Sequence, residues 1–288
     1  MGGTVAADGV TARGLGLRGP RGWAFRAVSF EAGPGSLITI EGPSGSGRTC
    51  LLLALTGRMK PTEGTATVAG TELPRRMAAV RRVSALAHVP GVTDLDPALT
   101  VAEHLSERAL LQRRFGDSLR ALLRPRQEGR AARRERIESA LTAAGLDLES
   151  LPKGARTAVR DLERAEALRL SLALALIARP RVLGVDDTDL KLSDTERAAI
   201  WELLRSIAAS GTTVLAVCSE APDGTVRVST AGTAEEADTG TDTEGTEGTD
   251  ETDDDTETEY DTESETESDE NGTDGKEAAD ALAQAGRA

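Results

Sequence analysis

Aromatic side chains are scarce in this sequence, since Trp, Tyr and Phe together make up 2% of the 288 residues. An arginine-rich stretch at residues 113–136 carries nine arginines but a single aromatic residue, Phe115. Surfaces that bind single-stranded nucleic acid combine basic residues with several aromatic rings on which the bases stack. We therefore expect no nucleic-acid partner, and we interpret the stretch as a solvated helical face.

Cysteines and long apolar runs are also nearly absent. Cys50 and Cys218 lie in apolar segments and lack the spacing of a disulfide framework or a zinc site, which favours a reducing cytosol. The longest apolar candidate, residues 168–177, is far shorter than the roughly 18 residues of a membrane span. The first 13 residues lack the charged-then-apolar order of a secretory signal. We expect a cytoplasmic protein that reaches the inner face of the cell membrane only through a partner.

Charge divides the chain into two parts. Residues 1–230 contain 32 basic and 26 acidic residues, whereas residues 231–288 contain 2 basic and 22 acidic residues. The second part repeats Thr, Asp, Glu, Gly and Ser, so burial cannot offset the entropy of ordering it. The sequence predicts one globular domain at residues 1–230 and a disordered acidic tail at residues 231–288. We also hypothesise that the tail folds over the basic residues 113–136.

The hydrophobic pattern of residues 1–230 predicts alternating strands and helices. Three short, β-rich apolar runs, at residues 36–41, 181–187 and 212–218, are typical of buried parallel strands. Residues 101–145 and 161–179 are rich in Ala, Leu and Arg, as expected for helices. The pattern predicts a parallel α/β core with an inserted helical portion.

A glycine-rich segment, the phosphate loop, follows the first predicted strand and precedes a predicted helix. It reads Gly42-Pro43-Ser44-Gly45-Ser46-Gly47-Arg48-Thr49. This order fits the pattern G-x-x-x-x-G-K-[ST] except that Arg48 replaces lysine. Glycines let successive backbone N–H groups converge on phosphate oxygens, and the helix directs its positive end at the same charge. The less specific alternative is an ordinary Gly/Ser turn between a strand and a helix.

Two acidic residues end the second predicted strand. Asp186 and Asp187 follow the apolar run at residues 182–185, and a carboxylate at this edge of a parallel sheet can hold Mg²⁺. An apolar run that ends in two solvated acids is common, so the pair alone is weak evidence. Together with the phosphate loop it predicts a magnesium–nucleotide site.

The order of these motifs resembles the nucleotide-binding domain of ATP-binding cassette (ABC) transporters, of a degenerate, exporter-like kind. Residues 56–64 are similar to the family's segment after the phosphate-loop helix, and residues 95–105 to the start of its helical subdomain. The resemblance implies a P-loop NTPase fold with a helical subdomain at about residues 95–178. It also implies Mg²⁺ and ATP as ligands, a membrane-embedded permease as partner, and a head-to-tail dimer with itself or another ABC subunit.

The resemblance assigns roles to particular residues. Thr49 and Asp186 would hold Mg²⁺, Asp187 would be the catalytic carboxylate, and Trp23 would stack on adenine unless it packs beside Phe25 on a strand. The ATP-binding residues would be Gly42, Pro43, Ser44, Gly45, Ser46, Gly47, Arg48, Thr49 and Cys50.

The signature that normally reads L-S-G-G-Q departs from the family pattern. Here it reads L-E-R-A-E at residues 162–166, so Glu163 and Glu166 bring negative charge toward phosphate unless Arg164 compensates. Asp187 is one methylene shorter than the family's glutamate, a displacement of about 1 Å that costs roughly 100-fold in rate. We expect ATP binding with impaired phosphoryl transfer.

Several other positions depart as well. Gly91 stands where the family has glutamine, Ser219 where it has the switch histidine, and Ser193 where it usually has aspartate. Neither His88 nor His104 aligns with the switch position, and both are interpreted as structural or surface histidines.

Two functions remain open at this point. The first is the ATP-binding subunit of a membrane transporter with weak or partner-dependent hydrolysis, which the similarity of residues 95–105 favours. The second is a pseudo-ATPase that uses nucleotide as a regulatory or structural ligand without transport, which Gly91 favours.

Overall fold

The structure is a computed structural model that describes residues 9–116, 126–188 and 191–230, without the side chains of residues 113–116 and 126–128. All of these residues belong to one compact unit. The tail at residues 231–288 and much of the basic stretch at residues 113–136 lie outside the described residues, and so does the hypothesis that joins them. The domain boundary at residue 230 stays a prediction.

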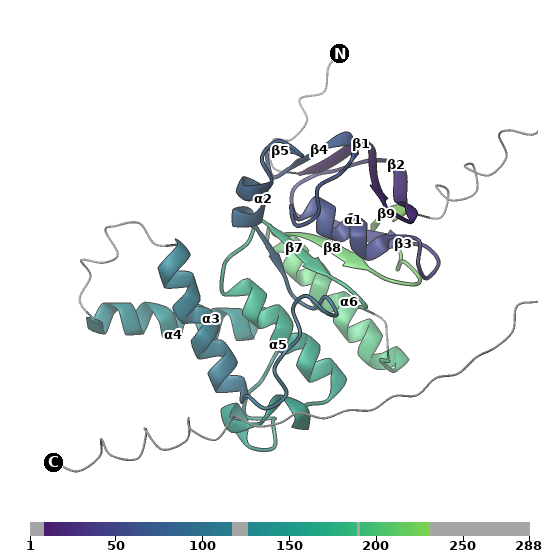
Figure 1. Cartoon of the computed structure of the whole chain (residues 1–288). Helices are drawn as coiled ribbons and strands as arrows, with labels where there is room; N and C mark the ends of the chain where they lie inside the picture. The colour runs from purple at the N-terminus through teal and green to yellow at the C-terminus, as the bar shows by residue number, and fades with distance from the viewer. Residues whose placement is uncertain (1–8, 117–125, 189–190, 231–288) are drawn as a thin grey trace, which may run out of the picture. The chain divides into compact units, whose positions relative to one another are not determined.

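A five-stranded parallel sheet forms the centre of the fold (Figure 1). Its order is β6 (Ser84–Leu86), β7 (Val182–Val185), β8 (Thr213–Val217), β3 (Leu37–Glu41) and β9 (Val226–Ser229). The three runs predicted as buried parallel strands are β3, β7 and β8, which the structure confirms. Every residue of β7 and β8 is buried, as expected for strands covered on both faces.

A second, antiparallel sheet was not predicted from the sequence. It has the order β2 (Gly22–Ala32), β1 (Val10–Gly19), β4 (Glu63–Val68) and β5 (Thr71–Leu73). Register shifts interrupt the pairing of β1 with β2, and Ala27 has a positive φ of 55°. These irregularities break the period-two alternation by which a strand is recognised in sequence.

Most of the described helices lie where the hydrophobic pattern predicts them, but the short helix Met77–Val83 was not predicted. The helices are α1 (Arg48–Leu55), α2 (Met77–Val83), α3 (Val101–Gly116), α4 (Arg126–Ala143), α5 (Arg164–Leu176) and α6 (Asp194–Ala209), with 3₁₀ turns η2 (Gly154–Arg156) and η3 (Val159–Asp161). Helices α3 to α5 lie within the predicted helical subdomain. Within the described ranges, no helix is both long enough and apolar enough to cross a membrane.

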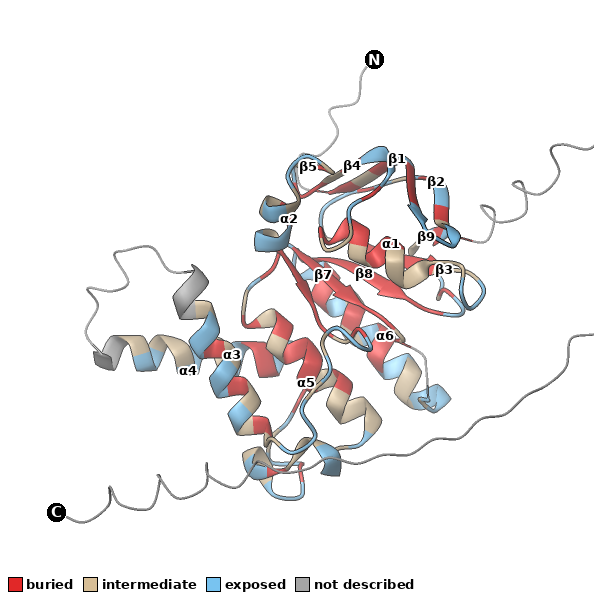
Figure 2. Cartoon of the chain, viewed as in Figure 1, coloured by how far each residue is buried: buried red, intermediate tan, exposed pale blue. Residues whose placement is uncertain are grey.

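The parallel strands are buried (Figure 2), and their alternate side chains enter two separate cores. Leu215 and Val217 of β8 pack with α1 and the antiparallel sheet, whereas Val214 and Ala216 pack with the helices α3 to α6. Period-two alternation makes this division unavoidable for a strand covered on both faces. The central sheet therefore packs against a hydrophobic core on each face, and this packing restricts movement of its carboxyl edge.

Gly184 in β7 tests how tightly this sheet is packed. A Cβ at this position would lie 2.7 Å from Cδ2 of Leu86 and 3.0 Å from Cδ1 of Leu52. We expect Gly184→Ala to lower the free energy of unfolding by about 1–3 kcal/mol through overpacking. Gly19→Ala is the control, because its Cβ would meet only the carbonyl oxygen of Gly22, at 3.9 Å. Equal urea midpoints for the two variants would contradict the packing described.

Candidate functional site

The phosphate loop joins β3 to α1, as the sequence predicts. Gly42, Gly45 and Gly47 all have positive φ, at 151°, 83° and 80°, and the N–H of Ser46 donates to the carbonyl of Pro43 at 3.2 Å. Only glycine adopts this sequence of conformations at low cost. The glycines therefore let the backbone turn tightly into α1, a conformation in which backbone amides can approach an anion.

Close approach to β2 fixes the shape of this loop. Gly47 is the N-cap of α1, and a Cβ on it would lie 2.0 Å from the carbonyl oxygen of Ala24. No side chain of the described residues caps α1, and its first turn holds no acidic residue. The positive end of the helix is therefore left for a ligand, which is the condition for binding phosphate.

Thr49 and Asp186 lie side by side at the carboxyl edge of the parallel sheet. The Thr49 hydroxyl donates to Oδ2 of Asp186 at 2.6 Å, although 137 residues separate the two. Asp186 is 3% exposed, and this burial raises the pKa of its carboxyl group, an effect opposed by the hydrogen bond from Thr49. Both ligands are oxygens, and Mg²⁺ prefers oxygen ligands from one or two carboxylates together with phosphate. The pair fits such an ion.

The described residues contain no cluster of three or more metal-ligating side chains. A magnesium ion at Thr49 and Asp186 would therefore need further oxygens from the nucleotide or from water.

Asp187 and Arg48 also lie at this edge. Asp187 is half-buried, has a positive φ of 49°, and donates its N–H to Oδ1 of Asp186 at 2.9 Å. Arg48 directs Nη1 to the carbonyl oxygen of Cys218 at 2.6 Å. The guanidinium thus spans from α1 to the end of β8, beside the loop. Cys50 is half-buried on α1, and burial together with the charge of Asp186 raises the pKa of its thiol.

Sequence reasoning missed one residue of this site, Thr230. It is completely buried, its N–H donates to the carbonyl of Glu41 at 2.9 Å, and its hydroxyl lies 2.6 Å from that of Ser46 in the phosphate loop. The signal was absent because a threonine after a short strand has no distinctive pattern. The contact arises from the parallel pairing of β9 with β3.

Trp23 belongs to β2, so it lies on a strand with Phe25, as the second of the two alternatives held. Its ring lies against Gly16, and the Cζ atoms of Arg18 and Arg26 lie over it at 5.6 and 4.7 Å from the ring centre. These are cation–π contacts. The two arginines therefore lie close to the ring on which adenine would have to stack.

The signature segment ends in an intrahelical cap. Oε2 of Glu166 accepts the N–H of Glu163 at 2.9 Å, so a carboxylate of the chain itself occupies the start of α5. Arg164 turns away and lies 3.2 Å from Nε2 of His88. Burial, and after it the charge of Arg164, lowers the pKa of His88. Arg164 therefore contacts His88 in the loop after β6 and does not form an ion pair with Glu163 or Glu166.

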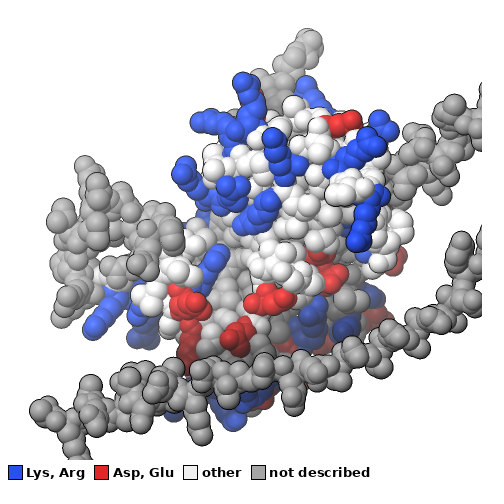
Figure 3. Space-filling model, in the orientation of Figure 1, with Lys and Arg blue, Asp and Glu red and all other residues white. Residues whose placement is uncertain are grey.

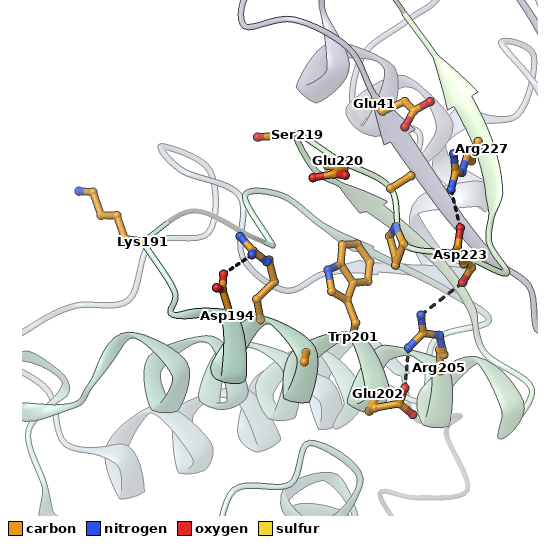
Figure 4. A pocket seen from close by; sticks show the side chains of 14 residues that line it. Glu41, Lys191, Asp194, Trp201, Glu202, Arg205, Ser219, Glu220, Asp223 and Arg227 are labelled. Carbon is orange, nitrogen blue, oxygen red and sulfur yellow. Dashed lines mark hydrogen bonds and ion pairs between the residues drawn. The ribbon is translucent and has the colours of Figure 1, made fainter.

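Ser219, which stands where the family has its switch histidine, borders a cavity of about 700 Å³ between α6 and the loop after β8 (Figure 4). Ser219 and Glu220 line its upper end, and Trp201 lies at its centre. The remaining wall carries both acidic and basic side chains, and among them Arg227 forms an ion pair with Asp223. No histidine lines this cavity among the described residues.

The other departures from the family pattern are equally plain. Gly91 has a φ of 74° and donates its N–H to Oδ2 of Asp94 at 2.9 Å. His104 lies on α3 with Nε2 3.2 Å from the carbonyl of Asp96. Ser193 is the N-cap of α6 and accepts from the N–H of Glu196. Residues 189–190, just before it, lie outside the described residues.

Comparison with known proteins decides the family. The sequence profile of the ABC transporter family matches residues 25–189, which is more than half of the chain. The chain belongs to the ABC transporter family. The match includes the phosphate loop, Asp186 and Asp187, and the expected P-loop fold and nucleotide-binding domain are confirmed. ABC domains bind ATP, generally with Mg²⁺.

Curated ABC relatives include Nod factor export ATP-binding protein I from several bacteria. The protein of Paraburkholderia xenovorans is 33% identical over 191 residues, which cover 65% of this chain and 55% of the relative. That of Rhizobium etli is 29% identical over 189 residues, covering 66% and 53%. The chain spans about half the length of the curated relatives it matches.

Solved ABC structures show the same fold. The ATP-binding cassette MJ0796 in a post-hydrolysis dimer has a TM-score of 0.57 at 22% identity, covering 73% of this chain and 88% of that one. CbiO1 of Clostridium perfringens, part of the cbiONQ transporter complex, has a TM-score of 0.58 at 18% identity, with 73% and 78% covered.

Asp186 gives a test of the site through stability. A raised folded-state pKa means that the folded protein holds a proton more tightly than the unfolded chain. Stability is then lost as pH rises from the unfolded pKa through the raised folded pKa. We expect Asp186→Asn to unfold at a higher denaturant concentration than the wild-type protein at pH 7 without Mg²⁺. Its stability should also change less between pH 4 and 7 than that of the wild-type protein. A less stable Asp186→Asn protein would contradict an electrostatic penalty at this position.

Proposed function

We propose that this chain is the ATP-binding subunit of an ABC-type membrane transporter and binds Mg-ATP with weak or partner-dependent hydrolysis. The observation that carries the proposal is the hydrogen bond between Thr49 and Asp186 beside an uncapped helix start. Export by the Nod factor relatives supports the transporter role, as does the fold. We further propose that residues 1–230 form the cassette, that residues 231–288 are a disordered tail, and that a permease holds the subunit at the inner face of the membrane.

The phosphate loop binds the polyphosphate in this proposal. Backbone amides between Gly45 and Thr49 donate to phosphate oxygens, and the dipole of α1 favours their charge. Arg48 adds a cation, provided that it leaves the carbonyl of Cys218. Mg²⁺, when bound, neutralises phosphate charge, and Thr49 and Asp186 are the residues that would hold it.

Hydrolysis is expected to be slow because several groups are poorly suited to it. Asp187 is short for orienting a water, and Ser219 cannot take the role of an imidazole. Glu166 holds a carboxylate at the start of α5, where the family offers donors to the ATP of the opposite subunit. A head-to-tail dimer of this chain would therefore contain two weakened sites, and a partner subunit would have to supply what is missing.

A regulatory pseudo-ATPase without transport is the second candidate. The capped start of α5 favours it, because a carboxylate in that place repels phosphate. Gly91 favours it too, because a glycine offers no side chain to sense Mg²⁺ or a permease. Co-purification of the full chain with a multi-span membrane protein separates the two functions.

Binding of ATP is tested with the full chain by calorimetry. We expect Mg-ATP to bind, and Arg48→Ala to weaken binding at least about tenfold, since a charge-assisted contact to phosphate is lost. Arg75→Ala is the control, because Arg75 is exposed and its ion pair with Glu72 is 3.9 Å long. Equal loss in both variants, or no binding to the wild-type chain at millimolar ATP, would remove the proposal.

Turnover is tested at Asp187. If the missing methylene limits hydrolysis, Asp187→Glu should raise the rate of phosphate release by about tenfold or more, whereas Asp187→Asn should not. Affinity for Mg-ATP should change little in both variants, because neither loses a phosphate contact. Unchanged release in Asp187→Glu would mean that the defect lies elsewhere, in Ser219 or in the signature segment.

A further inference from the structure

The cavity between α6 and the loop after β8 is separate from the candidate nucleotide site (Figure 4). Among the described residues, none of residues 42–49 lines it, and neither Asp186 nor Asp187 does. Its volume is about 700 Å³. Pockets that enclose small organic molecules measure roughly 300–1,000 Å³. The cavity is therefore large enough for a ligand of its own.

Most basic side chains of the wall are already paired with carboxylates. Three ion pairs are present, Arg197 with Asp194, Arg205 with Glu202 at 2.6 Å, and Arg227 with Asp223 at 3.1 Å. Lys191, the remaining base of the wall, is exposed and extends away from Trp201 (Figure 4). The wall therefore offers little unpaired positive charge to an anion such as phosphate.

Two carboxylates of the wall have no such partner. Glu41 is the last residue of β3, and Glu220 lies in the loop after β8. In the part of the chain that the structure describes, neither carboxylate forms an ion pair or a hydrogen bond. Figure 4 shows both on the side of the cavity opposite α6. Two carboxylates facing one space attract a cation, although solvated carboxylates alone do not define a site.

Trp201 supplies an independent observation. It is 5% exposed and lies at the centre of the cavity, yet its indole N–H has no hydrogen-bond acceptor among the described residues. Within those residues, the only fully enclosed side-chain nitrogen or oxygen without a partner is Nε of Arg169. The indole nitrogen is therefore open to the cavity that the ring lines. Because buried tryptophans normally donate this N–H, the arrangement calls for an oxygen acceptor on a ligand.

The charge of the surrounding surface also favours a cation. Residues 9–83 contain 11 basic and 4 acidic residues, whereas residues 84–230 contain 21 of each. The space-filling view shows Lys and Arg over the region of β1, β2, β4 and α2, and Asp and Glu mostly below it (Figure 3). In the same orientation α6 lies below that basic region (Figure 1). A cation that enters the cavity beside α6 therefore avoids the most positive part of the domain.

We propose that this cavity binds a small organic cation that carries a carbonyl oxygen close to its amine. The ammonium group pairs with Glu41 and Glu220, and the carbonyl oxygen accepts the indole N–H of Trp201. Both contacts satisfy groups of the wall that have no other partner, and the contact to the carboxylates is charge-assisted. Amides of basic amino acids have this chemistry. The site goes beyond the proposed nucleotide binding and does not depend on it.

The first test follows the two indole N–H resonances of the full chain, labelled with ¹⁵N and assigned with Trp23→Phe. We expect lysinamide to shift the Trp201 resonance downfield and to leave that of Trp23, which lies close to two arginines, unchanged. 1,5-Diaminopentane has the same two amines without the carboxamide, so it should bind about threefold or more weakly. No shift at millimolar lysinamide, or equal shifts of both resonances, would overturn the proposal.

The second test removes the two negative charges. In a double variant with Glu41→Gln and Glu220→Gln, lysinamide should bind about fivefold or more weakly at low salt, with a smaller loss at higher salt. Glu149→Gln is the control, because Glu149 is exposed and does not line the cavity. Equal affinities in the wild-type chain and both variants would refute the role of the carboxylates. The Trp23 resonance reports whether each variant is folded.

The third test addresses the indole donor. Trp201→Phe keeps an aromatic ring but removes the N–H, so it should abolish the preference for lysinamide over 1,5-diaminopentane while both still bind. An unchanged preference would contradict the hydrogen bond from Trp201. None of these measurements contains nucleotide, so a failure of the proposed ATP binding leaves their outcome unaffected.

Discussion

The site depends on one hydrogen bond, the donation from Thr49 to Asp186 across the carboxyl edge of the parallel sheet. It joins the first turn of α1 to the residue after β7 and so holds the phosphate loop next to the buried carboxylate. Burial of Asp186 raises its pKa, which is a cost to the empty protein and an attraction for a cation. The two cores on either face of the sheet keep that edge from relaxing.

Around this bond, the proposed function distinguishes the residues that would bind phosphate from those, altered from the family pattern, that would cleave it. The glycine conformations and the uncapped start of α1 are in place. The start of α5, in contrast, is filled by Glu166, and Arg164 is directed to His88. Because the carboxylate of Glu166 accepts the N–H of Glu163, that N–H is not available to a phosphate group. Under the proposed function, these two sets of features favour a cassette that depends on nucleotide binding more than on the rate of hydrolysis.

The contact between Ser46 and Thr230 adds a further element, because it joins the residue after β9 to the phosphate loop. The parallel pairing of β9 with β3 brings these two residues together, although they are far apart in the sequence.

Much of the parallel core could be predicted from sequence, because buried strands and the glycine pattern of the phosphate loop are local properties. The spacing of residues 42–49, together with Asp186 at the end of a predicted strand, was enough to predict a magnesium–nucleotide site. The antiparallel sheet could not be predicted, because bulges in β1 and β2 disturb the alternation that marks a strand. Trp23, Arg164 and Thr230 obtained their partners only from the fold. Each of those partners lies on another strand or helix, and which distant segments meet is decided by how strands pair and helices pack in three dimensions.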